Sequence, residues 1–162
     1  MGSGKTTLLG EVSDVLTARD VVHAAIDVDN LANGNIPDAY ALEEQNLRAV
    51  VTNYRAADIE HFVVAQALES RARRDALEKL FQELWEDVVM AVCRLTASVA
   101  DMQRRIRVRE PGSQQGTFVA RVAELDARLS AAAVEDFQIV NDGSRSVTDL
   151  ATEMLKIAAW IA

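Results

Sequence analysis

Apolar runs of strand length alternate along the chain with amphipathic segments of helix length. Four runs rich in Val, Ile and Ala are predicted strands, at residues 21–26, 61–68, 88–95 and 137–140. Six segments with apolar residues at helical spacing are predicted helices, at residues 5–19, 38–54, 71–85, 99–108, 118–132 and 147–160. Because strands that alternate with helices are typical of a parallel sheet covered by helices on both faces, we expect an α/β fold.

Composition narrows the class of protein that this pattern describes. With 162 residues, 25 acidic side chains and 17 basic ones, the chain has a net charge of −8, which disfavours nucleic acid and anionic membrane as partners. The one cysteine, Cys93, lies in an apolar run and is expected to be a small buried residue rather than half of a disulfide. We expect a single domain over residues 1–162 in a cytoplasmic setting, with the oligomeric state left open.

The first predicted helix follows a short motif of glycine, serine, lysine and threonine. The motif consists of Gly2, Ser3, Gly4, Lys5, Thr6 and Thr7, and it matches the second half of the Walker A pattern. Its glycines let backbone N–H groups turn inward around phosphate oxygens, and the helix N-terminus adds partial positive charge. Lys5 is placed to reach the β and γ phosphates and Thr6 to bind Mg²⁺, so the motif predicts ATP and Mg²⁺.

The first half of the Walker A pattern is not in the chain. Its leading glycine lies five positions before Gly4, which falls before Met1, and the strand that feeds the loop would lie there too. In P-loop folds that strand is central, so its loss would leave an unpaired edge on each neighbouring strand. We therefore expect the chain to lack the first, central strand of its fold, as a fragment or a late start would.

Two carboxylates follow the first predicted strand. Asp27 and Asp29 lie at i and i+2 and are followed by Asn30, where the carboxyl end of a parallel strand borders the ligand site of an open α/β sheet. One carboxylate can support Mg²⁺ while the other orients or deprotonates an attacking hydroxyl group. An acidic turn in which Asp29 caps a helix is the alternative. We assign Asp27 to the metal, and Asp29 with Asn30 to the acceptor.

The phosphate motif and the Asp-x-Asp element together resemble the small-molecule kinase branch of P-loop proteins, which includes adenylylsulfate, shikimate and gluconate kinases. The resemblance implies phosphoryl transfer from MgATP to a small-molecule acceptor, with Lys5 and Asp29 catalytic. Leu31 and Ala32 stand where adenylylsulfate kinases carry an arginine, and residues 66–70 lack their Ile-Ser-Pro element, which counts against sulfate activation. The Gly-Gly-Gly element of shikimate kinases is absent as well.

The resemblance also assigns a lid to residues 99–118. In these kinases lid arginines close over the phosphates, and Arg105 and Arg109 stand one helical turn apart, just before a Pro-Gly break. Guanidinium groups that arrive on closure stabilise the charge that spreads over the transferred phosphoryl group. Both arginines are therefore predicted to be catalytic, and a solvated helix face is the alternative for each of them.

Two further polar segments have simpler explanations. Residues 140–147 follow the last predicted strand, where related kinases contact adenine, but a turn with a helix cap explains them equally well. The arginines at 71, 73 and 74 are expected to form a solvated helix face.

Three functions compete for this sequence. An ATP-dependent small-molecule kinase needs the acidic pair and the lid arginines to meet at the phosphate motif. A nucleotide switch or transport ATPase needs an Asn-Lys-x-Asp, Asp-x-x-Gly or Leu-Ser-Gly-Gly-Gln motif, and the sequence has none of them. A non-catalytic or truncated nucleotide-binding domain is favoured by the missing strand. The kinase is our preferred interpretation.

Overall fold

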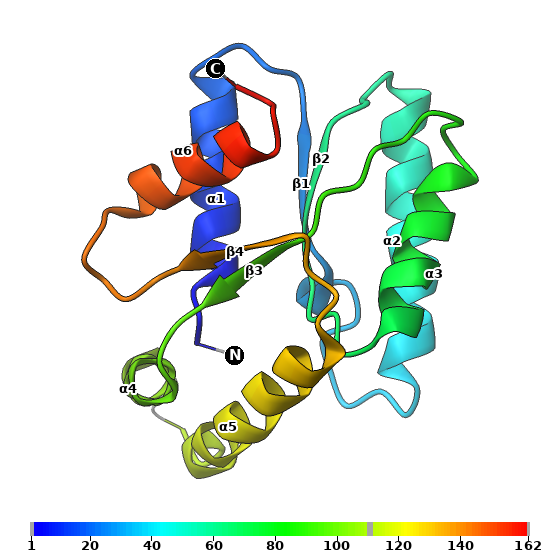
Figure 1. Cartoon of the computed structure of the whole chain (residues 1–162). Coiled ribbons are helices and arrows are strands. Elements are labelled where there is room, and N and C mark those ends of the chain that lie inside the picture. Colours follow the sequence, from blue (N-terminus) through cyan, green and yellow to red (C-terminus); the bar gives the residue numbers. More distant parts are fainter. Residues whose placement is uncertain (1, 110–111, 162) are drawn as a thin grey trace.

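Helices and short strands alternate in the order that the sequence predicts (Figure 1). A computed structural model describes residues 2–109 and 112–161 of the chain. The elements are α1 (Lys5–Thr17), β1 (Ala24–Asp27), the 3-10 turn η1 (Val28–Asn30), α2 (Ala39–Ala56), β2 (Phe62–Ala65), α3 (Arg71–Gln82), β3 (Cys93–Thr96), α4 (Val99–Arg109), α5 (Gln115–Ala132), β4 (Phe137–Val140) and α6 (Val147–Ile157).

The strands are shorter than their apolar runs, because a residue joins a strand only where it has a partner. β4 begins and ends as predicted. The strand predicted at residues 88–95 pairs with β4 only from Cys93 onward, so residues 88–92 are not part of the sheet. The ladder of β2 likewise ends at Ala65, opposite Asp27. α5 begins at Gln115 rather than at the predicted residue 118, and residues 110 and 111 of the predicted lid lie outside the described residues.

The strands form two separate two-stranded sheets, both parallel. β1 pairs with β2, and β3 pairs with β4. The predicted α/β class with parallel strands is confirmed, whereas the sheet is divided between β2 and β3. The strand expected before Met1 concerns residues outside the chain and stays a prediction.

Helices cover both faces of the β1–β2 sheet. On one face, α1 and α6 pack side by side and enclose Val12, Leu16 and Leu155 at 1% exposure or less. This cluster also includes Val63 of β2 and Ile139 of β4, so α1 and α6 pack against both sheets. On the other face α2 and α3 enclose a second cluster around Ile26, Val28, Leu47, Val51, Leu80 and Phe81. Buried apolar area of this kind is the main stabilising term of the fold.

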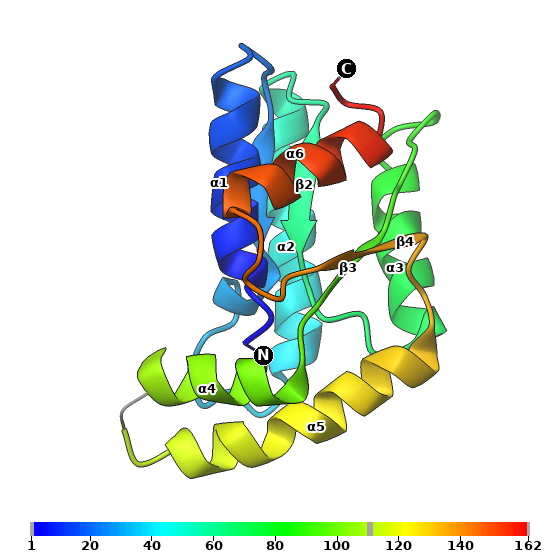
Figure 2. The same ribbon diagram turned by 60° about the vertical axis from the view of Figure 1, so that its left-hand side comes forward.

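The third cluster lies between α4 and α5, which run side by side below the sheets (Figure 2). It is built on Met102, Ile106 and Val122. This helix pair therefore has its own apolar contact, next to the start of α1. Within the described ranges, no helix is both long and apolar enough to span a bilayer.

Candidate phosphate and acceptor site

The phosphate motif, residues 2–7, forms a tight turn that leads into α1. Gly2 and Gly4 have φ values of 75° and 103°, in the left-handed region that glycine adopts without strain. Gly4 is the N-cap of α1, and it provides no side-chain hydrogen bond to the first turn. The N–H groups at the start of α1 are therefore not occupied by a side-chain cap, which is the arrangement that an anion-binding helix N-terminus requires.

The two glycines are also needed for space. A Cβ at Gly2 would lie 2.6 Å from the carbonyl oxygen of Met102 in α4, and one at Gly4 would lie 2.7 Å from Nδ2 of Asn141. Real Cβ atoms do not approach other heavy atoms so closely. The motif is thus fitted between α4 and the residue that follows β4, and this fit depends on both glycines.

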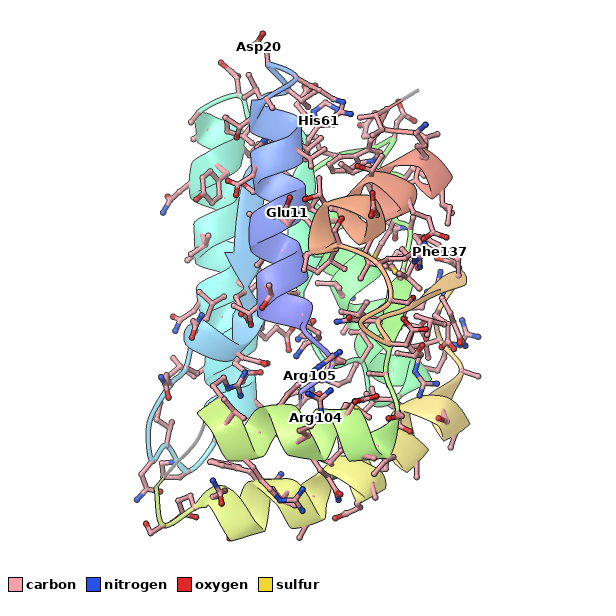
Figure 3. The ribbon with its side chains drawn as sticks, turned by 90° about the vertical axis from the view of Figure 1, so that its left-hand side faces the viewer. Glu11, Asp20, His61, Arg104, Arg105 and Phe137 are labelled. Carbon is pink, nitrogen blue, oxygen red and sulfur yellow. The ribbon has the colours of Figure 1, made fainter. Side chains whose placement is uncertain are left out.

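Arg105 braces the motif from α4. Its guanidinium group donates to the carbonyl oxygens of Gly2 (3.4 Å) and Ser3 (3.2 Å), and to the carbonyl oxygen of Asn141 (3.0 Å). Asn141 Nδ2 also donates to the Ser3 carbonyl, at 2.7 Å. Figure 3 shows Arg105 directed from α4 toward the start of α1. Because C=O and N–H point in opposite directions across a trans peptide, the N–H groups of Ser3 and Gly4 face away from Arg105.

The acidic pair lies against the other side of the motif. The hydroxyl group of Thr6 donates to Asp27 Oδ2 at 2.7 Å, and Lys5 Nζ lies 3.3 Å from Asp29 Oδ2. Asp27 ends β1, and its side chain also accepts from the backbone N–H of Asp29, which holds the turn η1. Residues far apart in the sequence therefore meet where the sequence predicts. Asn30 ends η1 and is exposed.

The oxygen atoms of Thr6 and Asp27 suit Mg²⁺. Mg²⁺ is usually held by one or two carboxylate or hydroxyl ligands together with substrate phosphates and water, rather than by a cage of protein side chains. The described residues contain no cluster of three or more His, Cys, Asp or Glu side chains that could hold a metal. A Thr–Asp pair at the phosphate motif therefore fits a metal that arrives with a nucleotide.

The second predicted lid arginine is placed differently from the first. Arg105 is half-buried and donates to the carbonyl groups of the phosphate motif, whereas Arg109 lies one turn further along α4 and is exposed. Arg104 pairs with Asp101 at 2.7 Å and is 69% exposed, in keeping with a solvated face. The structure thus brings Arg105 to the phosphate motif and places Arg109 at the exposed end of α4.

A pocket between α2 and α3 was not predicted from the sequence. It measures about 190 Å³ and is lined by Tyr40, Glu44, Leu47, Gln66, Ala72, Arg73, Ala76 and Leu77. It opens beside the carboxyl end of β2, next to the end of β1 that carries the acidic pair.

The expectation of a solvated face at residues 71–74 is wrong for Arg73 and Arg74. Both side chains are only 16% exposed; Arg73 lies 3.5 Å from Glu43, and Arg74 lies 2.9 Å from Asp136. Burial lowers the pKa of Arg73 to about 10, against the opposing effect of Asp29. Burial, followed by the charge of Asp29, raises the pKa of Glu43. The sequence could have indicated this burial through the position of the arginines, because they begin the helix that follows the carboxyl end of β2.

No protein-family model and no curated protein sequence matches the chain significantly. Among solved structures, the chain is similar to the APS kinase CysC of Mycobacterium tuberculosis, determined in complex with AMPPNP and APS. The TM-score is 0.68 at 19% sequence identity, and the match covers 98% of this chain and 92% of that one. The similarity shows the fold along almost the whole chain.

Proposed function

We propose that this protein is an ATP- and Mg²⁺-dependent phosphotransferase that acts on a hydroxyl group of a small-molecule acceptor. The main observation in support is that the phosphate motif contacts the acidic pair: Lys5 donates to Asp29 and Thr6 donates to Asp27. The similarity to a kinase determined with AMPPNP, an ATP analogue, supports a nucleotide at the phosphate motif. Nucleotide-dependent phosphoryl transfer is the activity that this combination of loop, acidic pair and fold supports best.

Each residue at the junction has a proposed task. The N–H groups of the motif and Lys5 would hold the β and γ phosphates, while Thr6 and Asp27 would hold Mg²⁺. Bound Mg²⁺ supplies neutralising charge to the phosphates. Lys5 pairs with Asp29 in this structure, so a γ phosphate that attracts Lys5 would release Asp29 to bind the acceptor. Nucleotide binding would thereby prepare the catalytic carboxylate.

The transfer itself requires few protein groups. The acceptor oxygen forms a bond to the γ phosphorus, the bond from that phosphorus to its bridging oxygen breaks, and ADP leaves with the electron pair. Asp29 takes the proton of the acceptor hydroxyl group. Arg105 keeps the motif in shape through Gly2 and Ser3, and Arg109 is proposed to reach the phosphates when the lid, residues 99–118, closes.

One observation favours a second candidate, a nucleotide-binding domain without turnover. The two sheets are not joined by a strand ladder within the described residues. The acidic pair follows β1 of one sheet, whereas the motif is braced by Arg105 of α4 and by Asn141, which follows β4 of the other sheet. Loss of alignment between these two groups would leave binding intact and stop transfer. Measuring binding and transfer separately distinguishes the two candidates.

For its setting, we propose the cytoplasm and partners limited to small molecules. Burial, with a further contribution from Glu153, raises the pKa of the Cys93 thiol to about 12, so the thiol stays protonated near neutral pH. The net charge of −8 disfavours binding to nucleic acid or to anionic membrane.

The test is MgATP binding by calorimetry together with ADP formation in the presence of candidate acceptors. Lys5→Ala is expected to lower turnover by roughly 10³-fold with an unchanged circular dichroism spectrum, because one cation at the transferred phosphate is lost. Lys156→Ala, on the surface of α6, is the matched control and should retain full activity. Normal turnover of Lys5→Ala would refute the proposal, and binding without turnover in the parent protein would favour the second candidate.

A further inference from the structure

The two sheets divide the molecule into two halves, and α1 and α6 pack against both of them. The first half consists of β1, β2, α2 and α3, and it carries Asp27 and Asp29. The second half consists of β3, β4, α4 and α5, and it carries the two side chains that brace the phosphate motif, Arg105 and Asn141. Because the motif is contacted from both halves, the position of one half relative to the other decides whether both sets of contacts form together.

The backbone does little to fix this relative position. No ladder joins β2 to β3 within the described residues. The chain passes from the first half to the second through residues 83–92, which form neither helix nor strand and include Val89 at 91% exposure. The apolar cluster of α1 and α6 contacts both sheets, but apolar packing is non-directional and permits small sliding movements. A directional contact between the halves would supply the geometry that these links lack.

Arg74 makes such a contact from the first turn of α3. Its guanidinium group donates to both carboxylate oxygens of Asp136, at 2.9 and 3.1 Å, and to the carbonyl oxygen of Val134. Asp136 also accepts from the backbone N–H of Val92, at 2.8 Å. Val92 precedes β3 and Asp136 precedes β4. One arginine of the first half is therefore bonded, directly or through Asp136, to the residues that lead into both strands of the second half.

The geometry of this contact differs from that of a surface ion pair. The Arg74 side chain is 16% exposed, and its two outer nitrogen atoms donate to different partners. A planar guanidinium group that is held at two nitrogens has a fixed orientation, so the contact resists displacement in more than one direction. The start of α3 lies next to the end of α5 (Figure 1 and Figure 2), and a second, more exposed ion pair crosses there, between Arg128 and Glu69 at 3.2 Å.

We propose that Arg74 is a positioning residue for phosphoryl transfer, whose bond to Asp136 aligns the acidic pair of the first half with the braced motif of the second half. This inference rests on the proposed function, because the alignment matters only where Asp29 and the motif act on the same γ phosphate. Val92 and Asp136 lie at the amino ends of β3 and β4, whereas Asn141 and the motif lie at the carboxyl end of β4. Arg74 therefore acts through position and not at the reacting atoms.

The experiment measures alignment and activity separately. Spin labels at the exposed positions Lys79→Cys in α3 and Gln138→Cys in β4 report the distance between the halves by pulsed electron paramagnetic resonance, with Cys93→Ala in every labelled protein. In unlabelled proteins, calorimetry gives MgATP affinity, and ADP formation from MgATP with water as acceptor gives the rate. Arg74→Ala is expected to broaden the distance distribution and to lower the rate by about ten- to a hundredfold, because a small misplacement of reacting groups slows transfer strongly. MgATP affinity should stay close to that of the parent protein.

Further variants grade this effect and control for it. Arg74→Lys keeps the charge and should recover part of the rate, and Arg128→Ala should lower the rate less than Arg74→Ala does. The double variant of Arg74→Ala and Asp136→Asn should lose no more rate than the worse single variant, because both changes remove the same contact. Arg48→Ala is the matched control, since its ion pair with Glu83 at 2.6 Å lies within the first half, and it should change neither the distance distribution nor the rate.

The spin labels separate this inference from the proposed function. A broadened distribution in Arg74→Ala, without ADP formation by the parent protein, would support the alignment by Arg74 and refute the proposed kinase. ADP formation by the parent protein, with an unchanged distribution or an unchanged rate in Arg74→Ala, would overturn the inference and leave the kinase in place. Should Arg74→Ala lose the circular dichroism spectrum of the parent, Arg74→Lys and Arg128→Ala decide, and parental distance distributions and rates in both would overturn the inference.

Discussion

The two helices that pack side by side on the β1–β2 sheet begin in opposite ways. α6 begins with a capping box, in which Ser146 accepts from the backbone N–H of Asp149 and the Asp149 side chain accepts from the backbone N–H of Ser146. α1 begins at Gly4, in a left-handed conformation and without a side-chain cap. The difference separates stability from function, because a side chain that caps a helix also occupies the N–H groups that an anion needs.

The same contrast appears in the surroundings of the two N-termini. The start of α6 is held by its own residues, within one turn of the chain. The start of α1 is held from outside, by Arg105 and Asn141, which lie more than a hundred residues away. A loop that must leave its N–H groups to a ligand is stabilised through its carbonyl groups instead.

The largest effect on this comparison is expected from Gly4→Ala. The new methyl group would meet Asn141 Nδ2 at 2.7 Å and would strain a residue at φ 103°. We expect a loss of about 1–3 kcal/mol in the free energy of unfolding, from the strained backbone. Nucleotide affinity should fall as Asn141 is displaced. Chemical denaturation and calorimetry with MgATP measure the two effects.

Gly10→Ala is the matched control for that change. Gly10 lies within the same helix, and apart from its chain neighbours and the backbone of that helix no atom lies within 4 Å of the added Cβ. Because alanine favours helix, stability should rise by roughly 0.5–1 kcal/mol while affinity for nucleotide stays the same. Equal behaviour of the two glycine variants would contradict the role given to Gly4.

A smaller effect, divided between binding and turnover, is expected from the two lid arginines. Arg105→Ala removes the donors to Gly2 and Ser3 and should weaken MgATP binding by about tenfold or more, because hydrogen bonds from a charged group are lost. Arg109→Ala should lower turnover more than it lowers ATP affinity. Steady-state kinetics alongside calorimetry resolves the split. Arg105→Ala with normal ATP affinity would argue against the bracing role, and Arg109→Ala with an unchanged rate would place Arg109 on a solvated face.

The smallest effect is expected from the capped helix. Ser146→Ala should lower the free energy of unfolding by about 1 kcal/mol, through loss of the N-cap hydrogen bond. For a chain of this size the melting temperature should fall by about 2–4 °C. MgATP affinity should not change, and Ser146→Thr should restore most of the stability. A loss of affinity in Ser146→Ala would show that the two helix N-termini are not independent.

The sequence was most informative where a contact depends on local motifs. The phosphate motif and the Asp-x-Asp element each carry their chemistry within a few residues, and a short crossover brings Thr6 to Asp27 and Lys5 to Asp29. The parallel order of the strands also followed from their alternation with helices. Such features depend on backbone geometry that short segments determine by themselves.

The sequence was least informative where side chains from elements far apart in the chain pack against one another. Arg105 resembled a lid residue, and only the packing of α4 against the start of α1 shows it bound to loop carbonyls. The burial of Arg73 follows from the approach of α2 to α3, which charge patterning does not reveal. The pocket at Gln66 depends on the same approach. Tertiary packing of this kind has no periodic signature along the chain.

The division of the strands into two sheets has a mechanical consequence. A hydrogen-bonded ladder resists shear strongly, whereas a layer of apolar side chains can slide by small amounts. The acidic pair belongs to the β1–β2 sheet and Asn141 follows the β3–β4 sheet, and the cluster around α1 and α6 connects the two. The alignment of Asp27 and Asp29 with Asn141 therefore depends on the stiffness of α1 and on how well its side chains pack. The phosphate motif, which all three residues surround, lies at the N-terminus of that same helix.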